Sequence, residues 1–495
     1  MKNFNYLCLS LVLILFACTK EVGMEDSLTT NKIEVNTDGT TIDAQRAINS
    51  LFSMLNEIDS TDETRSGSVS YRIINQELVE MKDVVGVTRA DSNEEVCAGI
   101  DNNFYIVNFE DDKGRLSSAV LGASENLPPV LAIMNGGDLS SADFQKAWQK
   151  MQNETTANPL SASLVTDVEE NTAPLENIIS FLSLPPATPG DKPILTPGTG
   201  DDDDDNDDDD TITPKYYYTE VETLSYDWVA KEGVGPLLYS HFNQVAPFNN
   251  DYDVIPNSTR KYYAGCGIVA LAQILSFNKI EKNVGPSVIS GKTINWRVIE
   301  TAINKQDSAY KHSYRYINTI NVCTETENEE LAKLHRAIFD SVEATTTPDG
   351  TYLSWLQAKY FLENRGCKNV TRTYYRDDLV VDMLVNKGLP IYTQGWCTEC
   401  DDGHAWVIDG RRRFERYANN LYIEYCDGEE LSRYSISEPT GEEDILIHCN
   451  WGYEGDRDGY FHSGIFDSHN AICTRSTSCV SDNYSEDTGM IFYNL

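Results

Sequence analysis

Positive charge is scarce in this chain of 495 residues. Lys and Arg total 39 against 78 Asp and Glu, which leaves a formal net charge of −39. Proteins hold a nucleic-acid backbone through clustered Lys and Arg, so this balance excludes nucleic acid as the partner. The remaining acidic surface is well solvated and does not specify a function.

Long hydrophobic runs are missing beyond the first residues. The run at 6–17 follows Lys2 and is too short to span a bilayer of ~30 Å, a pattern typical of an export signal. It ends LFAC at 15–18, which resembles a bacterial lipoprotein signal whose cysteine is lipidated. We therefore expect residues 1–17 to be removed and Cys18 to anchor the protein to the bacterial cell envelope, surface-exposed or released after processing. An ordinary secretory signal is the alternative.

Cysteine is present at twelve positions. Cys8 would leave with the signal and Cys18 would carry lipid, so ten remain (12 − 2). An oxidising compartment permits disulfides among them, although their connectivity cannot be read from sequence. The spacing of Cys473 and Cys479 suits a small closed loop.

A Pro- and Asp-rich stretch at 184–213 divides the chain. It contains DDDDDNDDDD at 201–210, where like charges repel and nothing can form a core. We interpret it as an exposed linker, with calcium binding as the alternative. Before it, 18–183 is predicted as a tether and a small α+β domain, with a helix over 42–58, strands near 103–109 and 118–122, and a polar helix from 142 to about 154. After it, 214–495 is one large domain.

The stretch YYAGCGIVALAQILSF at 262–277 predicts a buried helix headed by Cys266 between two glycines. A cysteine in the first turn of a helix feels the positive end of the macrodipole, which lowers the thiol pKa and favours thiolate. The flanking glycines allow a substrate backbone to approach closely. The alternative is a thiol that packs as a small hydrophobe.

A nucleophilic cysteine needs a base, and His404 is the strongest candidate among seven histidines. It lies in GHAWVIDG at 403–410, which places an imidazole at the start of a buried strand. It follows Cys266 by 138 residues (404 − 266), within the ~130–150 residue window of papain-type enzymes. A hydrogen-bonded core histidine is the alternative.

The third candidate group lies in HCNWGY at 448–453. We expect the side-chain oxygen of Asn450 to accept the proton on the second ring nitrogen of His404 and fix its tautomer. The indole of Trp451 would shield that hydrogen bond from water. A plain turn after a core strand is the alternative.

Together these motifs resemble the streptopain family of papain-like cysteine peptidases. The resemblance rests on Gly265-Cys266 with ALAQIL at 270–275, on GHAWVIDG at 403–410 and on NWG at 450–452. GPLL at 235–238 and QVAPFN at 244–249 add to it, so that it covers most of 214–495.

The resemblance implies a papain-like α+β fold, in which a helix carrying the cysteine packs on an antiparallel sheet carrying the histidine and asparagine. It implies a preceding α+β propeptide that blocks the cleft until it is cut away. It assigns Cys266 as nucleophile, His404 as general base and acid, Asn450 as orienting residue and Trp451 as its cover. Protein or peptide substrates follow, without cofactor or metal.

The oxyanion hole departs from papain, which places a glutamine six residues before the cysteine; Arg260 stands there in this chain. Gln394, in PIYTQG at 390–395, matches a glutamine that the streptopain family carries shortly before its histidine. We assign it to the oxyanion hole or the substrate cleft, with the backbone N–H of Cys266 as the other donor. A strand-end glutamine in water is the alternative.

A second departure is the pair Cys397 and Cys400 in the loop before His404, where the family carries a shorter, glycine-rich loop. Disulfides are one interpretation. The other is a metal site that includes His404 and is completed by Cys426 or Cys449, which would exclude the imidazole as a base.

The sequence therefore predicts an exported, lipid-anchored cysteine endopeptidase made as a zymogen and acting through an acyl-enzyme. Two other classes stay open: an inactive surface-binding lipoprotein of the same fold, and a metal or redox module built on Cys397 and Cys400. Acyl transfer to an amine would use the same cysteine and histidine.

Overall fold

The computed structural model describes residues 42–60, 69–79, 103–124, 127–142, 216–312, 317–348, 350–397, 402–464, 466 and 486–495. All of them belong to one unit, which comprises residues 41–495. The predicted signal with Cys18, nearly all of the predicted helix from 142 to 154, the linker at 184–213, and Cys473 and Cys479 lie outside the described residues. No helix in the described ranges has the length and apolar character needed to cross a bilayer.

An antiparallel sheet organises the described part of the chain. Its strand order is β1-β2-β3-β4-β14-β13-β12-β11-β15-β10, and β5 pairs with β12. The strands are β1 (Tyr71–Val79), β2 (Phe104–Asp111), β3 (Leu116–Gly122), β4 (Val130–Asn135), β5 (Tyr217–Val234), β10 (Lys368–Tyr374), β11 (Ile391–Cys397), β12 (Asp402–Cys426), β13 (Glu429–Asn450), β14 (Gly459–His462) and β15 (Glu486–Asn494).

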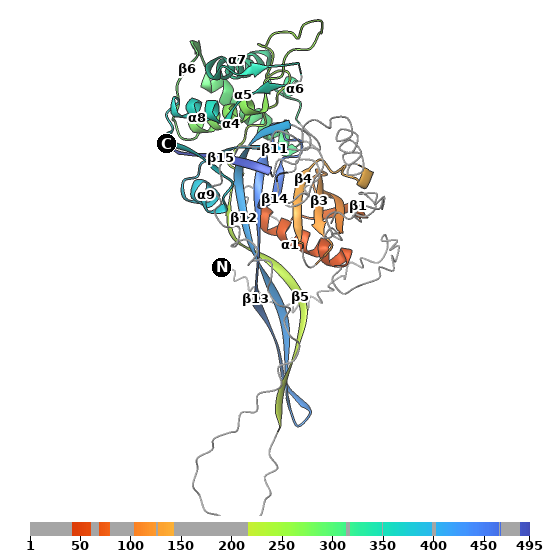
Figure 1. The fold of residues 1–495 in the computed structure, drawn as a ribbon. Coiled ribbons are helices and arrows are strands. Elements are labelled where there is room, and N and C mark those ends of the chain that lie inside the picture. Colours follow the sequence, from red (N-terminus) through yellow and green to blue (C-terminus); the bar gives the residue numbers. More distant parts are fainter. Residues whose placement is uncertain are drawn as a thin grey trace, which may run out of the picture. The chain divides into compact units, whose positions relative to one another are not determined.

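Most helices gather at one end of this sheet, where Figure 1 shows α4 to α8 together above β11 and β15. The helices are α1 (Ala44–Ser60), α4 (Cys266–Ile280), α5 (Trp296–His312), α6 (Thr319–Val322), α7 (Glu325–Val342), α8 (Trp355–Glu363) and α9 (Asp377–Val381), which continues into the π-helix η4 (Asp382–Asn386). Two short hairpins accompany them: β6 (Val288–Ile289) with β7 (Lys292–Thr293), and β8 (Thr345–Thr346) with β9 (Thr351–Tyr352).

Helix α4 is the central helix of the core. It is apolar on every side, and its residues from Gly267 to Asn278 are all buried, as expected for a helix surrounded by protein. It packs on β11 and β12 and against α5 and α7. Because Cys266 begins this helix, while His404 lies on β12 and Asn450 ends β13, the predicted fold class is confirmed.

The N-terminal part is a small α+β arrangement, as predicted. Helix α1 packs on β2, β3 and β5, and β2 and β3 form a hairpin with Phe104 opposite Gly122. Its last strand, β4, pairs with β14, so the sheet continues without interruption into the C-terminal part. The domain boundary at 184–213 stays a prediction.

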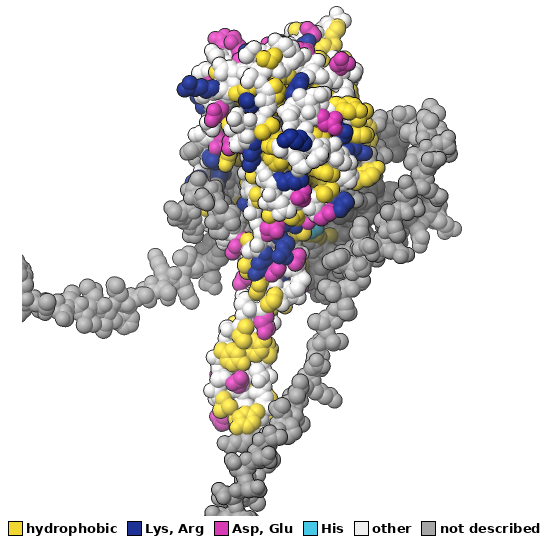
Figure 2. Space-filling model, turned by 90° about the vertical axis from the view of Figure 1, so that its left-hand side faces the viewer, with side chains coloured by type: hydrophobic (Ala, Val, Ile, Leu, Met, Phe, Trp, Pro, Cys, Tyr) yellow, Lys and Arg dark blue, Asp and Glu magenta, His cyan; other side chains and the backbone are white. Residues whose placement is uncertain are grey.

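Three long strands form a ribbon that the sequence analysis did not predict. β12 pairs with β5 from Arg411 to Cys426 and with β13 on its other edge, and Figure 1 shows the three strands running on together past α1. Stacked tyrosines join neighbouring strands, with ring centroids 4.8 Å apart for Tyr218 and Tyr425. Figure 2 shows hydrophobic side chains along the ribbon; the large exposed ones are Tyr217, Val221, Leu224, Tyr226, Leu431, Tyr434 and Ile436.

His335 of α7 is fully buried between aromatic rings. Its centroid lies 5.3 Å from that of Phe242 and 5.0 Å from that of Phe248, and its Nδ1–H donates to the Leu331 carbonyl at 2.8 Å. Burial disfavours the charged ring and lowers the pKa of His335 to about 4. The imidazole is therefore neutral in the folded protein at neutral pH.

We expect His335 to make the protein less stable in mild acid. Between pH ~6.5 and ~4 the unfolded chain binds a proton at this ring that the folded chain does not, so the free energy of unfolding falls as pH falls. The full loss is ~3 kcal/mol. Urea denaturation near pH 7 and near pH 4.5 should show a smaller acid-induced loss for His335→Leu than for wild type, by about 2 kcal/mol. Equal losses in both proteins would contradict this assignment.

Candidate active site

Cys266 is the first residue of α4, and Gly265 precedes it as N-cap with φ 95° and ψ 137°. A Cβ at residue 265 would lie 2.7 Å from the Thr351 Cβ and 2.8 Å from its carbonyl oxygen, so only glycine fits this approach. The thiol is half-buried at the positive end of a helix that is otherwise enclosed in the core. A helix N-terminus attracts negative charge, which is the environment that the sequence analysis predicted for this thiol.

The other described cysteines are in different surroundings. Burial raises the pKa of Cys323 and Cys367 to about 12 and that of Cys449 well above its ordinary value. Cys426 is half-buried but ends β12 in the ribbon. None of the five cysteines whose side chains the structure describes is in a disulfide, and among them Cys266 alone combines accessibility with a helix N-terminus.

His404 lies near the start of β12 with 4% of its surface exposed. Its Nε2 is 2.9 Å from the main-chain oxygen of Trp451, and the hydroxyl of Tyr453 is 3.3 Å from its Nδ1. Because a carbonyl oxygen only accepts, Nε2 carries the proton of the neutral ring and Nδ1 keeps its lone pair. In this tautomer Nδ1 is the nitrogen that would act as the predicted general base.

The predicted contact between Asn450 and His404 is wrong. The Asn450 side-chain oxygen instead accepts from Nε2 of Gln273 at 2.7 Å and from the N–H of Gly452 at 3.2 Å. Its amide nitrogen donates to the Ser240 carbonyl at 3.1 Å. Asn450 is buried, so these nearer partners satisfy its amide, and the Trp451 carbonyl takes the proton of the imidazole.

Asn450 nevertheless acts on His404 through one peptide group. The N–H of Gly452 and the C=O of Trp451 belong to the same peptide group. The side-chain oxygen of Asn450 accepts a hydrogen bond from that N–H, and Nε2 of His404 donates one to that C=O. Gln273 completes the chain and lies on α4, two turns after Cys266. A hydrogen-bonded relay thus runs from the helix that carries Cys266, the candidate nucleophile, to His404, the candidate base.

The turn at 450–453 also brings the two catalytic candidates to one place. A Cβ at Gly452 would lie 2.8 Å from Cγ1 of Val269, which is one helical turn after Cys266. The same turn supplies the carbonyl and the hydroxyl that contact His404. The first turn of α4 and the imidazole therefore pack against the same four residues.

Trp451 is fully buried beside His404, with ring centroids 6.0 Å apart. Its indole also packs against Trp406 at 5.0 Å and edge-on against Phe461 at 5.3 Å. The indole lies beside the imidazole, but the Asn450–His404 hydrogen bond that it was predicted to cover is not formed, and shielding of the ring from water stays a prediction.

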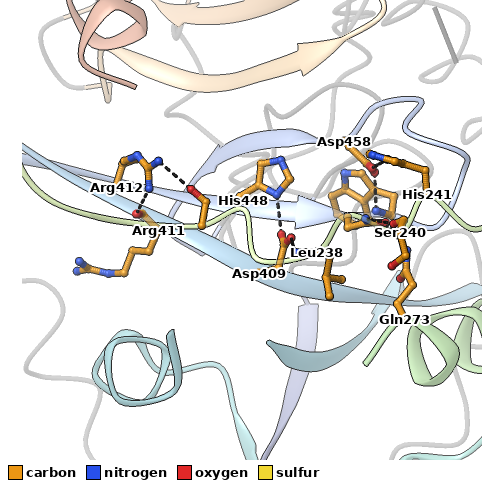
Figure 3. Close-up of polar contacts among 12 residues, drawn as sticks. Leu238, Ser240, His241, Gln273, Asp409, Arg411, Arg412, His448 and Asp458 are labelled. Atoms are coloured by element: carbon orange, nitrogen blue, oxygen red, sulfur yellow. Dashed lines mark hydrogen bonds and ion pairs between the residues drawn. The ribbon is translucent and has the colours of Figure 1, made fainter. Parts of the chain in front are cut away.

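Asp458 is a buried residue that sequence reasoning missed. Its Oδ1 accepts the N–H of Trp451 at 2.8 Å, and its Oδ2 lies 3.8 Å from Nδ1 of His241. Figure 3 shows Asp458 and His241 side by side. Asp458 therefore fixes the residue whose carbonyl orients the base, and the only sequence signal was an acid just before strand β14.

A second buried acid secures the chain where β5 ends. Asp409 accepts from Nδ1 of His448 at 2.6 Å and from the N–H of Leu238 at 3.0 Å, as Figure 3 shows for the histidine. Arg412 donates to the Gly235 carbonyl at 2.8 Å. These bonds attach the GPLL segment at 235–238 to β12.

Gln394 lies on β11, where its residue pairs with Ala405, next to His404. Its Nε2 is 3.5 Å from the Leu353 carbonyl, and its Oε1 accepts from the Tyr392 hydroxyl at 3.4 Å. That hydroxyl is 3.1 Å from where a Cβ of Gly267 would lie, so Gln394 borders the tip of α4. Its assignment to the oxyanion hole stays a prediction.

The metal site that combined His404 with Cys426 is excluded by the length of β12. The two residues are 22 positions apart (426 − 404) on one strand, which corresponds to roughly 70 Å. The side chain of Cys397, and Cys400 itself, lie outside the described part. Within that part no group of three metal-ligating side chains occurs.

A thiol at a helix N-terminus and an imidazole on an antiparallel sheet, both against one turn, form the arrangement expected of a papain-like cysteine peptidase site. Residues 242–461 match the peptidase C10 family. This part of the chain is therefore similar to that family, the streptopain family of cysteine peptidases.

Two solved structures from Prevotella intermedia are similar to the chain. A prointerpain A fragment is 15% identical with a TM-score of 0.39 and covers 78% of this chain and 94% of its own. The active wild-type interpain A cysteine protease is 18% identical with a TM-score of 0.35, covering 52% of this chain and 94% of its own. Comparison with curated proteins found no match.

The relay predicts a selective effect of Asn450→Ala on catalysis. Without the side-chain oxygen the Trp451–Gly452 peptide is free to rotate, so His404 is misoriented and kcat should fall by ~10²-fold. Initial rates of peptide hydrolysis at varied substrate concentration, repeated across pH, report kcat and KM separately. Asn278→Ala is the matched control, since Asn278 is a buried asparagine on α4 that bonds Cys367 and Tyr493 instead of the catalytic turn. A similar fall in kcat for both variants would show that the effect is merely structural.

Proposed function

We propose that the protein is a cysteine endopeptidase, exported and lipid-anchored through Cys18 and made as a zymogen. The observation that supports it best is the packing of the first turn of α4 and of His404 against the turn at 450–453. A thiol at the first residue of an apolar helix would supply the nucleophile, and the Nδ1 lone pair of His404 would supply the base.

In the proposed mechanism Nδ1 of His404 takes the proton of the Cys266 thiol, and the resulting thiolate attacks the peptide carbonyl and forms a tetrahedral intermediate. The backbone N–H of Cys266, with Gln394, stabilises the oxyanion. The protonated imidazole of His404 gives its proton to the leaving amine, and water then hydrolyses the acyl-enzyme with the same ring as base. The Trp451 carbonyl holds the ring throughout.

Covalent labelling tests the nucleophile directly. The epoxide inhibitor E-64 should modify Cys266, and peptide mapping should find no label on Cys426, which is also half-buried. Absence of label on Cys266 would favour the inactive binding lipoprotein instead. Cleavage of casein into internal fragments would establish endopeptidase activity.

Activation is proposed to require a cut near 184–215, between the α+β part and the catalytic part. A cut alone would not separate them, because residues 132–134 of β4 pair with residues 459–461 of β14. Sequencing the N-terminus of the processed form locates the cut, and full activity of a single intact chain would refute the zymogen. Labelled palmitate entering wild type but not Cys18→Ser tests the anchor.

A further inference from the structure

A cavity lies beside the catalytic pair, where α8, β10, β11 and β15 meet. Its wall includes Trp355, Arg372, Tyr392, Gln394 and Trp396. The aromatic members give it apolar sides, and Arg372 gives it one positive charge.

Two contacts place this cavity next to both catalytic candidates. The hydroxyl of Tyr392 abuts Gly267, the neighbour of Cys266, because a Cβ there would lie 3.1 Å from it. The indole of Trp396 covers Gly403, the neighbour of His404, where a Cβ would lie 2.7 Å from the ring. A group bound in the cavity would therefore lie close to the reacting bond.

Arg372 is held in position by stacking rather than by an acid. Its guanidinium carbon lies 4.8 Å from the Trp355 ring centroid and 5.3 Å from that of Tyr374. The group also lies across Gly489, where a Cβ would be 3.0 Å from Nε and 3.1 Å from one terminal nitrogen. Glycine at 489 thus makes room for the guanidinium.

The charge of Arg372 is uncompensated in the part of the chain that the structure describes. Its Nε is buried without a hydrogen-bond partner, and no carboxylate there forms an ion pair with it. Neighbouring arginines differ: Arg376 pairs with Asp378, and Arg411 pairs with Glu232 and Asp377. In a chain with twice as many acids as bases, a stacked arginine without an acid beside a catalytic thiol points to an external carboxylate.

We propose that this cavity binds an acidic side chain, Glu or Asp, of the peptide substrate near the scissile bond. Arg372 would donate two parallel hydrogen bonds to the carboxylate, and Trp355 and Trp396 would contact the methylene groups. Stacking holds the guanidinium in one position before the substrate arrives, which reduces the entropy lost on binding. This specificity rests on the proposed peptidase function.

Matched peptides test the proposal. Internally quenched peptides that differ only in Glu or Gln at one position flanking the cleaved bond give a ratio of kcat/KM values. For wild type the ratio should favour Glu by about 10-fold at one position. Arg372→Gln should bring that ratio to about one, whatever happens to the absolute rates. Gly489→Ala should lower it as well, because the new methyl group displaces the guanidinium.

Arg376→Gln is the control, since Arg376 is exposed, lies four residues further on and already has a partner; its ratio should equal that of wild type. Arg372→Lys keeps the charge without the fork and should give an intermediate ratio, so the proposal stays testable if Arg372→Gln is unstable. A wild-type ratio near one at every position, or one that Arg372→Gln leaves unchanged, would overturn this specificity alone. Failure to cleave either peptide, with Cys266 unlabelled by E-64, would overturn the peptidase function as well.

Discussion

Cys266→Ala is expected to lower the rate of casein cleavage by ~10⁴-fold or more and to stop self-processing. The thiolate forms the covalent intermediate, and a methyl group cannot replace it. The side chain is half-buried at the helix tip, so the variant should fold with little change in stability. Gel-based proteolysis under reducing conditions, followed over time, measures both effects.

The matched control for this variant is Cys426→Ala. It removes the other half-buried thiol, which lies at the far end of β12 from His404, and should leave cleavage unchanged. Casein cleavage retained by Cys266→Ala would reject the assignment of the nucleophile. If both variants lost the same amount of casein cleavage, the loss could not be assigned to one catalytic sulfur at residue 266.

Trp451→Ala is expected to lower the free energy of unfolding by about 3–5 kcal/mol. The indole is fully buried and contacts Trp406, Phe461 and the His404 ring, so its removal leaves a large cavity in the core. Urea denaturation measures this loss. The cavity also admits water beside the imidazole, so the folded fraction should lose activity too.

Trp451→Phe separates the two effects. It retains most of the packing while leaving the main-chain carbonyl and its bond to His404 in place, so it should lose clearly less stability than the alanine variant. A loss below about 1 kcal/mol for Trp451→Ala would show that the site collapses around the missing ring. Full activity of the folded alanine variant would remove the shielding function assigned to the indole.

The shared sheet affects how the propeptide-like part can leave. The pairing of β4 with β14 means that release exposes the edge of a strand that neighbours β13, which ends at Asn450. Release of the N-terminal part would therefore act on the geometry of the turn at 450–453 through strand β14, which pairs with both β4 and β13. This connection makes the N-terminal part more than a tether in the proposed zymogen.

Local pattern was enough for several elements of the fold. An unbroken apolar run predicted the buried helix α4, and glycines on both sides of Cys266 singled out its tip. Strand alternation predicted the β2–β3 hairpin, and the motif at 403–410 put His404 at the start of a buried strand. These features can be predicted from residues close together in the sequence, because buried positions repeat with the period of each helix or strand.

Tertiary structure alone decided which polar atoms meet. Asn450 was expected to accept a hydrogen bond from His404. Its side-chain oxygen instead accepts from Gln273, which is 177 positions away along the chain. The parts played by Asp458 and Arg372 and the ribbon of β5, β12 and β13 likewise depend on segments brought together from distant parts of the sequence. A buried amide bonds the partners nearest to it in space, and no local spacing encodes those distances. The sequence by itself thus determined which residues are the candidate reacting groups, whereas folding determined which atoms hold and surround them.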